Sequence, residues 1–197
     1  MNCSFCKQVH YSNYCPIEKQ FSKVFKCQTG YFMEYFVANN VKCPECKKNK
    51  LRVIGDNSPS NDLICINCNQ KFEIKSKCLS STIIPKDIVV NHGIYDKYLE
   101  QKEKGLNFIF IIYGIDRLNH NICIREILYC CNFNIENTIY VKKNNNDVYS
   151  TISIPNRLKL NKLSLPKDNI INFDGFYNFI MLQKQQSINN DIIINNY

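Results

Sequence analysis

Two Cys-x-x-Cys pairs, separated by eighteen residues, constrain this chain more than any other feature. The first pair is Cys43 and Cys46, in CPEC, and the second is Cys65 and Cys68, in CINC. Each pair puts two thiolates on one tight turn, and the residues between them suffice for a hairpin that brings the two turns together. This spacing is typical of a structural zinc site, although four free buried cysteines are the alternative. The sequence therefore predicts a zinc ribbon over residues 43–68.

An acidic, acidic, basic triplet is interleaved with the second pair, at Asp62, Glu73 and Lys75. Glu73 and Lys75 are two residues apart, so on a strand both side chains point to the same face, which Asp62 can reach from a neighbouring strand. Two carboxylates hold a divalent cation, and an adjacent lysine positions water and offsets phosphate charge. The triplet favours phosphodiester hydrolysis, but a surface strand also carries Glu and Lys for solubility.

The order of residues around this triplet resembles the catalytic domain of the DpnI family of restriction endonucleases, within the PD-(D/E)xK superfamily. That pattern has a CPxC turn, a catalytic aspartate three residues before a second CxxC turn, and E-x-K followed by Ser-Lys. All of these stand in the same order here, with Ser-Ser-Thr-Ile at residues 80–83 and an acid, Glu34, nine residues before Cys43. The resemblance covers roughly residues 25–173 and is densest over residues 34–83; residues 107–114 resemble the family's next core strand.

The resemblance implies a metal-dependent endodeoxyribonuclease that leaves a 5′-phosphate. Asp62 and Glu73 would bind one or two magnesium ions with the carbonyl of Ile74, and Lys75 would orient the attacking water or stabilise the pentavalent phosphate. Glu34 is either an accessory acid or a solvated helix glutamate. The implied partner is double-stranded DNA, with direction to adenine-methylated sites as one option. Family members carry a C-terminal winged-helix domain that reads methylated GATC, and this chain is expected to end about where that domain would begin.

A second metal pattern stands at the N-terminus, where residues 1–20 form a predicted zinc-knuckle-like extension without a recognised counterpart in the family. Its ligands would be Cys3, Cys6, His10 and Cys15. The spacing is that of a retroviral-type knuckle shortened by one residue and lacking its glycine. Cys27 is an alternative fourth ligand, and a cysteine-bearing terminus without metal is the other interpretation.

Composition agrees with a nucleic-acid partner. The formal net charge is +8 and the pI about 8.8, and two zinc sites would lower that charge to about +5. A moderate positive field suits phosphate binding, although most lysine-rich surfaces are only solvated. No signal peptide or membrane-spanning stretch is evident, so we expect a soluble, intracellular protein. Of the 12 cysteines, those at 78, 123, 130 and 131 are expected to be ordinary core residues.

The expected fold is α/β (α+β), a PD-(D/E)xK core with a mixed central sheet flanked by helices, in one nuclease domain over residues 21–197. Helices are predicted over residues 21–39 and 86–104. Strands are predicted over residues 63–75, 106–114 and 121–130, the second of them buried on both faces. A hairpin is predicted over residues 138–154 around a polar turn at 144–147.

Three functions remain open at this point. The first is the endodeoxyribonuclease, which the intact triplet favours. The second is a non-catalytic, zinc-dependent nucleic-acid-binding protein on a nuclease-derived fold. The third is a zinc ribbon that binds protein partners, in which case the triplet is a coincidence and nothing depends on magnesium.

Overall fold

The computed structural model describes residues 29–48, 51–54, 61–105, 107–116, 119, 121–132, 139–143 and 149–172. These residues form a mixed central sheet of seven strands, a second sheet of three strands and few helices. The predicted α+β class with a mixed central sheet is confirmed. The predicted N-terminal extension, the polar turn at 144–147 and everything after residue 172 lie outside the described residues.

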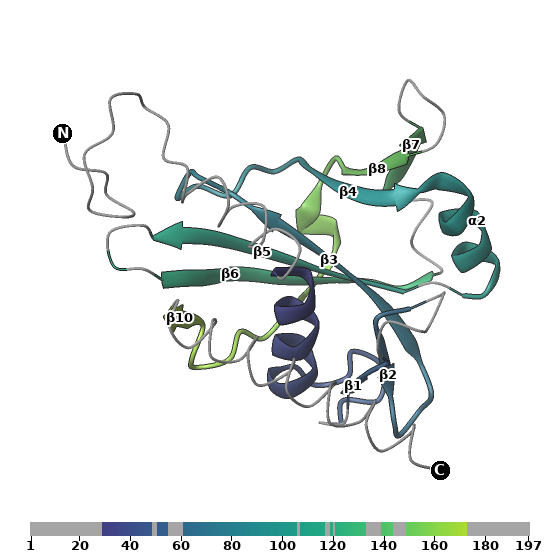
Figure 1. Ribbon diagram of the computed structural model, residues 1–197, viewed down its shortest axis with the longest axis horizontal. Helices are drawn as coiled ribbons and strands as arrows, with labels where there is room; N and C mark the ends of the chain where they lie inside the picture. Colours follow the sequence, from purple (N-terminus) through teal and green to yellow (C-terminus); the bar gives the residue numbers. More distant parts are fainter. Residues whose placement is uncertain are drawn as a thin grey trace, which may run out of the picture.

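The central sheet carries the segments around the predicted four-cysteine site and the predicted acidic site (Figure 1). β3 and β5 are parallel, whereas the other neighbours pair antiparallel. β5 is buried along its first seven residues, as predicted for a central strand. The strand order is β1 (Leu51–Val53), β2 (Leu63–Cys65), β3 (Lys71–Cys78), β5 (Phe108–Asp116), β6 (Asn121–Cys130) and β10 (Ile170–Asn172), with β9 (Asn161–Leu163) also paired to β6.

One face of the central sheet is covered by a helix over residues 29–40, which is the described part of the helix predicted at 21–39. The helix is amphipathic, and its apolar residues at 32, 33, 36 and 37 recur at helical spacing on one side. They pack on alternate residues of β3 and β5, among them Phe72, Ile74, Ile109 and Ile111. We call this cluster the first core.

The other face is covered by the second sheet and a short helix. The second sheet has the order β4 (Ile88–Ile94), β8 (Tyr149–Ile154) and β7 (Tyr140–Lys143), and the helix is α2 (Tyr95–Glu103). β7 and β8 form the predicted hairpin. The second core between the layers contains Phe108, Phe110 and Ile112 of β5. Strand alternation therefore separates the two cores, because successive residues of β5 point to opposite faces.

The predicted helix over residues 86–104 is wrong in its first half, because residues 88–94 form β4. Ile88 and Val90 are buried and Val89 is 47% exposed, which is the alternation of a strand with one face on a core. β4 pairs with β8, with a register shift between Asn91 and Gly93. The sheet is thus flanked by a helix on one face, but mainly by a second sheet on the other.

A buried ion pair fastens the loop before β4 to the central sheet. Glu126, on the second-core face of β6, is 3% exposed and accepts hydrogen bonds of 2.9 and 2.7 Å from one Arg157 nitrogen. Lys162 adds a contact of 3.1 Å to the same carboxylate. Arg157 also donates to the backbone carbonyls of Ile84 and Pro85. This cluster is a structural counterpart to the acidic site on β3.

Candidate zinc and active sites

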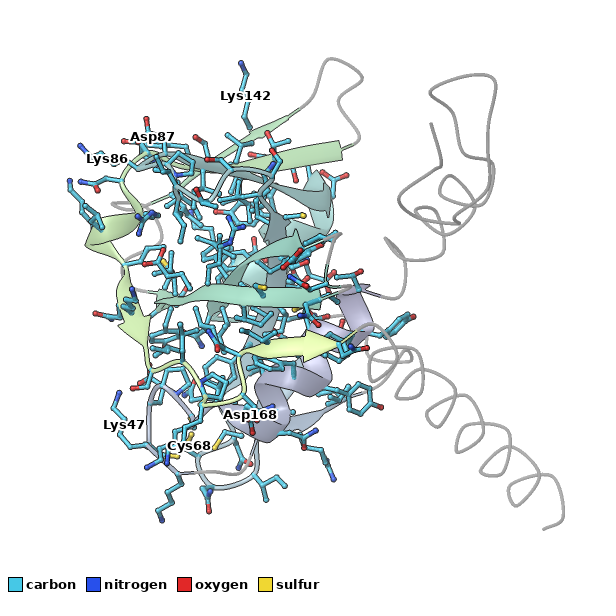
Figure 2. All side chains as sticks on the ribbon, turned by 90° about the vertical axis from the view of Figure 1, so that its left-hand side faces the viewer. Lys47, Cys68, Lys86, Asp87, Lys142 and Asp168 are labelled. Atoms are coloured by element: carbon cyan, nitrogen blue, oxygen red, sulfur yellow. The ribbon has the colours of Figure 1, made fainter. Side chains whose placement is uncertain are left out.

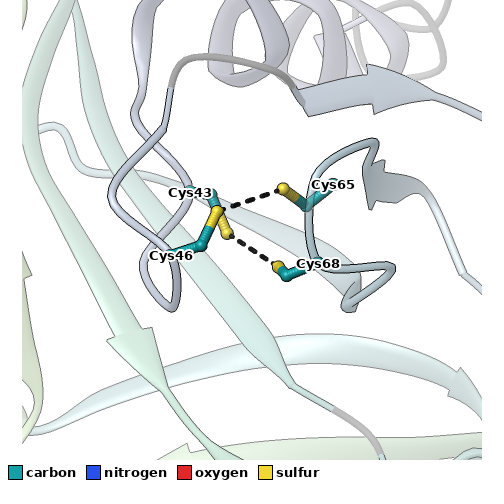
Figure 3. Close-up of side chains that lie close together, drawn as sticks. All are labelled: Cys43, Cys46, Cys65 and Cys68. Carbon is teal, nitrogen blue, oxygen red and sulfur yellow. Dashed lines mark hydrogen bonds between the residues drawn. The ribbon is translucent and has the colours of Figure 1, made fainter.

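The four cysteines of the predicted zinc ribbon converge, with all four sulfurs within 4.8 Å of one another (Figure 3). The Sγ atoms of Cys43 and Cys68 are 3.7 Å apart, and those of Cys46 and Cys65 are 3.5 Å apart. A tetrahedral zinc ion with metal–sulfur bonds of about 2.3 Å separates its ligands by roughly 3.8 Å. The donor set and its spacing therefore fit a structural zinc ion.

The two cysteine turns have the same backbone construction. In each, the residue after the second cysteine donates its N–H to the carbonyl of the first, Lys47 to Cys43 at 2.9 Å and Asn69 to Cys65 at 2.8 Å. Lys47 and Asn69 both have left-handed backbone angles, with φ of 61° and 58°. Asparagine tolerates this region and lysine does so less readily. Figure 2 shows Lys47 and Cys68 at one end of the molecule, opposite Lys86 and the second sheet.

The thiols differ in acidity before metal binds. Burial raises the pKa of Cys43 to about 12. Burial also acts to raise the pKa of Cys65, but hydrogen bonds from the backbone N–H groups of Cys68 and Asn67 outweigh it and lower that pKa to about 7. Cys65 therefore gives up its proton to a cation more easily than Cys43 does.

Asp62 lies where β3 changes partners. Lys71 and Phe72 of β3 pair with β2, and from Glu73 onward β3 pairs with β5. The N–H of Glu73 points to β5, where it donates to Asn107 at 2.9 Å, so the N–H of Ile74 points to the opposite edge. There the Asp62 carboxylate accepts that N–H at 2.6 Å. Asp62 therefore bonds to the edge of β3 just beyond its pairing with β2, which begins at Leu63.

Glu73 is held by two side chains. Lys75 donates to one carboxylate oxygen at 2.6 Å, and Gln101 of α2 donates to the other at 2.9 Å. Glu73 and Gln101 are each 2% exposed. Because Phe72 and Ile74 belong to the first core, Glu73 and Lys75 point to the second-core face, as the two-residue spacing predicts. A buried carboxylate with a lysine partner is charge-balanced within the protein.

Asp62 directly precedes β2, and Glu73 is on β3, which pairs with β2. Asp62 donates its N–H to the carbonyl of Phe72 at 3.1 Å, and its carboxylate accepts the N–H of Ile74, so it is bonded to the residues on both sides of Glu73. Glu34 is on the helix that covers the first core, on the other face of β3 from Glu73. In the described part of the chain, the four cysteines are the only group of three or more metal-ligating side chains within 4.8 Å.

Two polar residues at this site were missed by the sequence analysis. Gln101 is in a polar helix, and nothing in its neighbourhood distinguishes it from its solvated neighbours. Asn107 is 5% exposed and immediately precedes the apolar strand β5. Its place directly before an all-apolar strand is the one sequence signal that could have identified Asn107.

The remaining cysteine predictions have mixed outcomes. Cys130 is buried, and Cys123 and Cys131 are half-buried, but Cys78 is exposed at the end of β3, so its assignment to the core was wrong. The predicted N-terminal ligands Cys3, Cys6, His10 and Cys15 lie outside the described residues.

The mixed central sheet and the four cysteines that fit a zinc ion agree with a restriction-endonuclease-like protein. The family model described as "DpnI: Dam-replacing family" matches residues 3–154. The chain belongs to this family. The match begins at residue 3, further toward the N-terminus than the resemblance over residues 25–173 indicated, and it spans the N-terminal cysteines. Among the described residues, the helices are too short or too polar to cross a membrane.

Proposed function

We propose that this chain is a metal-dependent endodeoxyribonuclease of the PD-(D/E)xK type that hydrolyses double-stranded DNA. The observation that carries the proposal is the placement of Asp62, which is bonded to the residues on both sides of Glu73, with Lys75 2.6 Å from the Glu73 carboxylate. Membership in a restriction-endonuclease-like family supports nuclease chemistry and DNA as the partner. Direction to adenine-methylated DNA is part of the proposal and rests on the family alone.

The donor atoms at this site suit magnesium. The two carboxylates supply hard oxygen ligands, and the carbonyl of Ile74 points to the same edge as its N–H, which contacts Asp62. A magnesium ion bound there would polarise the scissile phosphate and neutralise the charge that develops on it. Asp62, Glu73 and Ile74 are the residues we assign to hold it.

Lys75 is the residue we assign to the attacking water. Its side chain is 15% exposed and its ammonium contacts a buried carboxylate, so Lys75 lies between the protein interior and the solvent. It would orient the water, whose oxygen forms a bond to phosphorus as the bond to O3′ breaks. The products are a 5′-phosphate and a 3′-hydroxyl. Glu34 enters the proposal only as an accessory acid.

The test is plasmid cleavage by the zinc-loaded protein with magnesium, on adenine-methylated and unmethylated DNA, beside Asp62→Asn and Lys75→Met. We expect both variants to lose cleavage by about 10³-fold. Glu126→Gln is the matched control, because it alters another buried, cation-paired carboxylate on the same face of the sheet. Assayed where circular dichroism shows it folded, it should cleave like the parent.

The second candidate function is zinc-dependent nucleic-acid binding without catalysis. The half-buried lysine and the two protein partners of Glu73 are compatible with an acid that never binds metal. DNA binding without cleavage in magnesium or manganese, unchanged by Asp62→Asn, would favour this candidate over the nuclease.

A further inference from the structure

Asn107 fastens the segment that leads into Glu73 through both backbone and side chain. Its carbonyl accepts the Glu73 N–H at 2.9 Å, beside the start of the β3·β5 ladder. Its side-chain nitrogen donates to the carbonyl of Lys71 at 3.2 Å and to the side chain of Gln70 at 3.3 Å. Its side-chain oxygen accepts the N–H of Asn132 at 3.1 Å. The position of Glu73 therefore depends on where Asn107 is held.

Tyr129 of β6 joins Asn107 to the first cysteine turn. Its single hydroxyl proton is shared between two acceptors, the side-chain oxygen of Asn107 at 3.3 Å and the carboxylate of Glu45, which lies between Cys43 and Cys46. Tyr129 is 4% exposed. Burial and the Glu45 carboxylate raise its pKa, so the phenol stays protonated and remains a donor.

The second cysteine turn reaches Asn107 by a different route. The N–H of Cys65 donates to the carbonyl of Gln70 at 2.8 Å, and the Gln70 side chain contacts Asn107. One zinc ion would hold both turns and so fix their relative position. The contacts of Tyr129 and Gln70 with Asn107 would then be fixed at the same time. A buried network with its members bonded to one another positions its groups more tightly than separate contacts do.

We propose that Asn107 is a positioning residue of the nuclease site, and that Tyr129 and Glu45 couple it to the zinc ribbon. In this arrangement the zinc ion does more than stabilise the fold, because it holds the strand segment that presents Glu73. The bearing on catalysis rests on the proposed nuclease function, whereas the mechanical coupling does not.

The coupling is measurable as hydrogen exchange of the Glu73 amide in the zinc-loaded full chain. Tyr129→Phe removes the hydroxyl but keeps the ring, which contacts Phe72 edge-on at 6.1 Å between centroids. Glu45→Ala removes the acceptor, and Glu45→Gln keeps one. We expect Tyr129→Phe and Glu45→Ala to speed exchange at Glu73 about fivefold, the effect of one lost buried hydrogen bond. Glu45→Gln should match the parent.

The controls separate coupling from a general loss of stability. Tyr140→Phe alters an exposed tyrosine of the second sheet and should leave Glu73 exchange unchanged. Faster zinc transfer to a chromogenic chelator in Tyr129→Phe and Glu45→Ala would support the proposal. Unchanged exchange at Glu73 in these two variants, or an equal rise along every strand, would overturn it.

A kinetic readout then links the coupling to catalysis. If the parent cleaves DNA, Tyr129→Phe should lower kcat with KM for DNA unchanged, because Glu73 is misplaced while the DNA-binding surface is intact. A change in KM alone would overturn the positioning role. A parent that does not cleave DNA would refute the proposed function, and the exchange result would still decide the coupling.

Discussion

The zinc site and the acidic site differ in how their ligands are occupied. The four cysteine sulfurs converge on one another at separations that suit a tetrahedral ion. The Glu73 carboxylate is instead bonded to Lys75 and Gln101, and Asp62 accepts the N–H of Ile74. The first site has the spacing of a metal site, whereas a metal ion at the second would have to displace protein partners. This difference agrees with a structural metal at the four cysteines, and it sets the acidic site apart as one whose carboxylates already have protein partners.

The largest expected effect comes from breaking the zinc site. Cys65→Ser removes a buried ligand, and full loss of zinc would cost on the order of 10 kcal/mol of folding free energy. We expect zinc content below one ion per chain and a large drop in the urea midpoint. Magnesium at millimolar concentration should not restore stability, because the acidic site does not hold the fold.

Cys78→Ser is the control for that substitution. Cys78 is exposed at the end of β3, outside the four-cysteine cluster, and surface changes of this kind usually stay within about 0.5 kcal/mol. Equal losses of stability in Cys65→Ser and Cys78→Ser would contradict the assignment of zinc to the fold.

A smaller effect is expected from Gln101→Glu, which places a second buried carboxylate beside Glu73. Like charges at this distance raise the pKa of the pair, so the folded variant holds a proton that the unfolded chain releases. The stability that this proton contributes is fully present below about pH 4, near the pKa of the unfolded chain. It is lost as pH rises through the pKa of the pair in the folded variant. We expect a deficit of roughly 1–3 kcal/mol at pH 8 that closes toward pH 5 in urea denaturation.

Gln101→Leu provides the comparison, because it removes the same hydrogen bond without adding a charge. Its deficit should be the same at pH 5 and pH 8. A pH-independent deficit in both variants would show that the Glu73 carboxylate is not buried against α2 as described, and would weaken the contrast between the two sites.

The features that were predicted correctly depend on short spacing. Two residues between the cysteines of a pair define a tight turn, and the single residue between Glu73 and Lys75 puts both side chains on one face of any strand. The all-apolar run of β5 likewise requires cover on both sides. In each case the geometry is local, so one sequence is enough.

The features that were missed depend on contacts between distant segments. Gln101 and Glu73 are 28 residues apart, and Tyr129 and Glu45 are 84 apart, with no local pattern to announce either contact. β4 was missed for another reason. Pro85 and Asp87 resemble a helix start. Ile88, Val89 and Val90 are all apolar, so their alternating burial becomes evident only when β4 is paired with β8.

The smallest expected effect concerns the protons displaced by zinc. Cys65 has a folded pKa of about 7 against an ordinary value of 9.0, so its thiolate stabilises the metal-free fold fully above pH 9 and less as pH falls through 7. Zinc binding should therefore release about one proton fewer at pH 8 than at pH 6. Cys43, with a pKa of about 12, releases its proton at both values.

Titration calorimetry in two buffers of different ionisation enthalpy, at each pH, measures that difference. Cys78→Ser should release as many protons as the parent, because Cys78 is not a ligand. Equal release at pH 6 and pH 8 would mean that Cys65 is an ordinary thiol until the metal arrives. In that case Cys65, like Cys43, would give up a proton to the metal, and the contrast between the cysteine site and the acidic site would narrow to ligand chemistry.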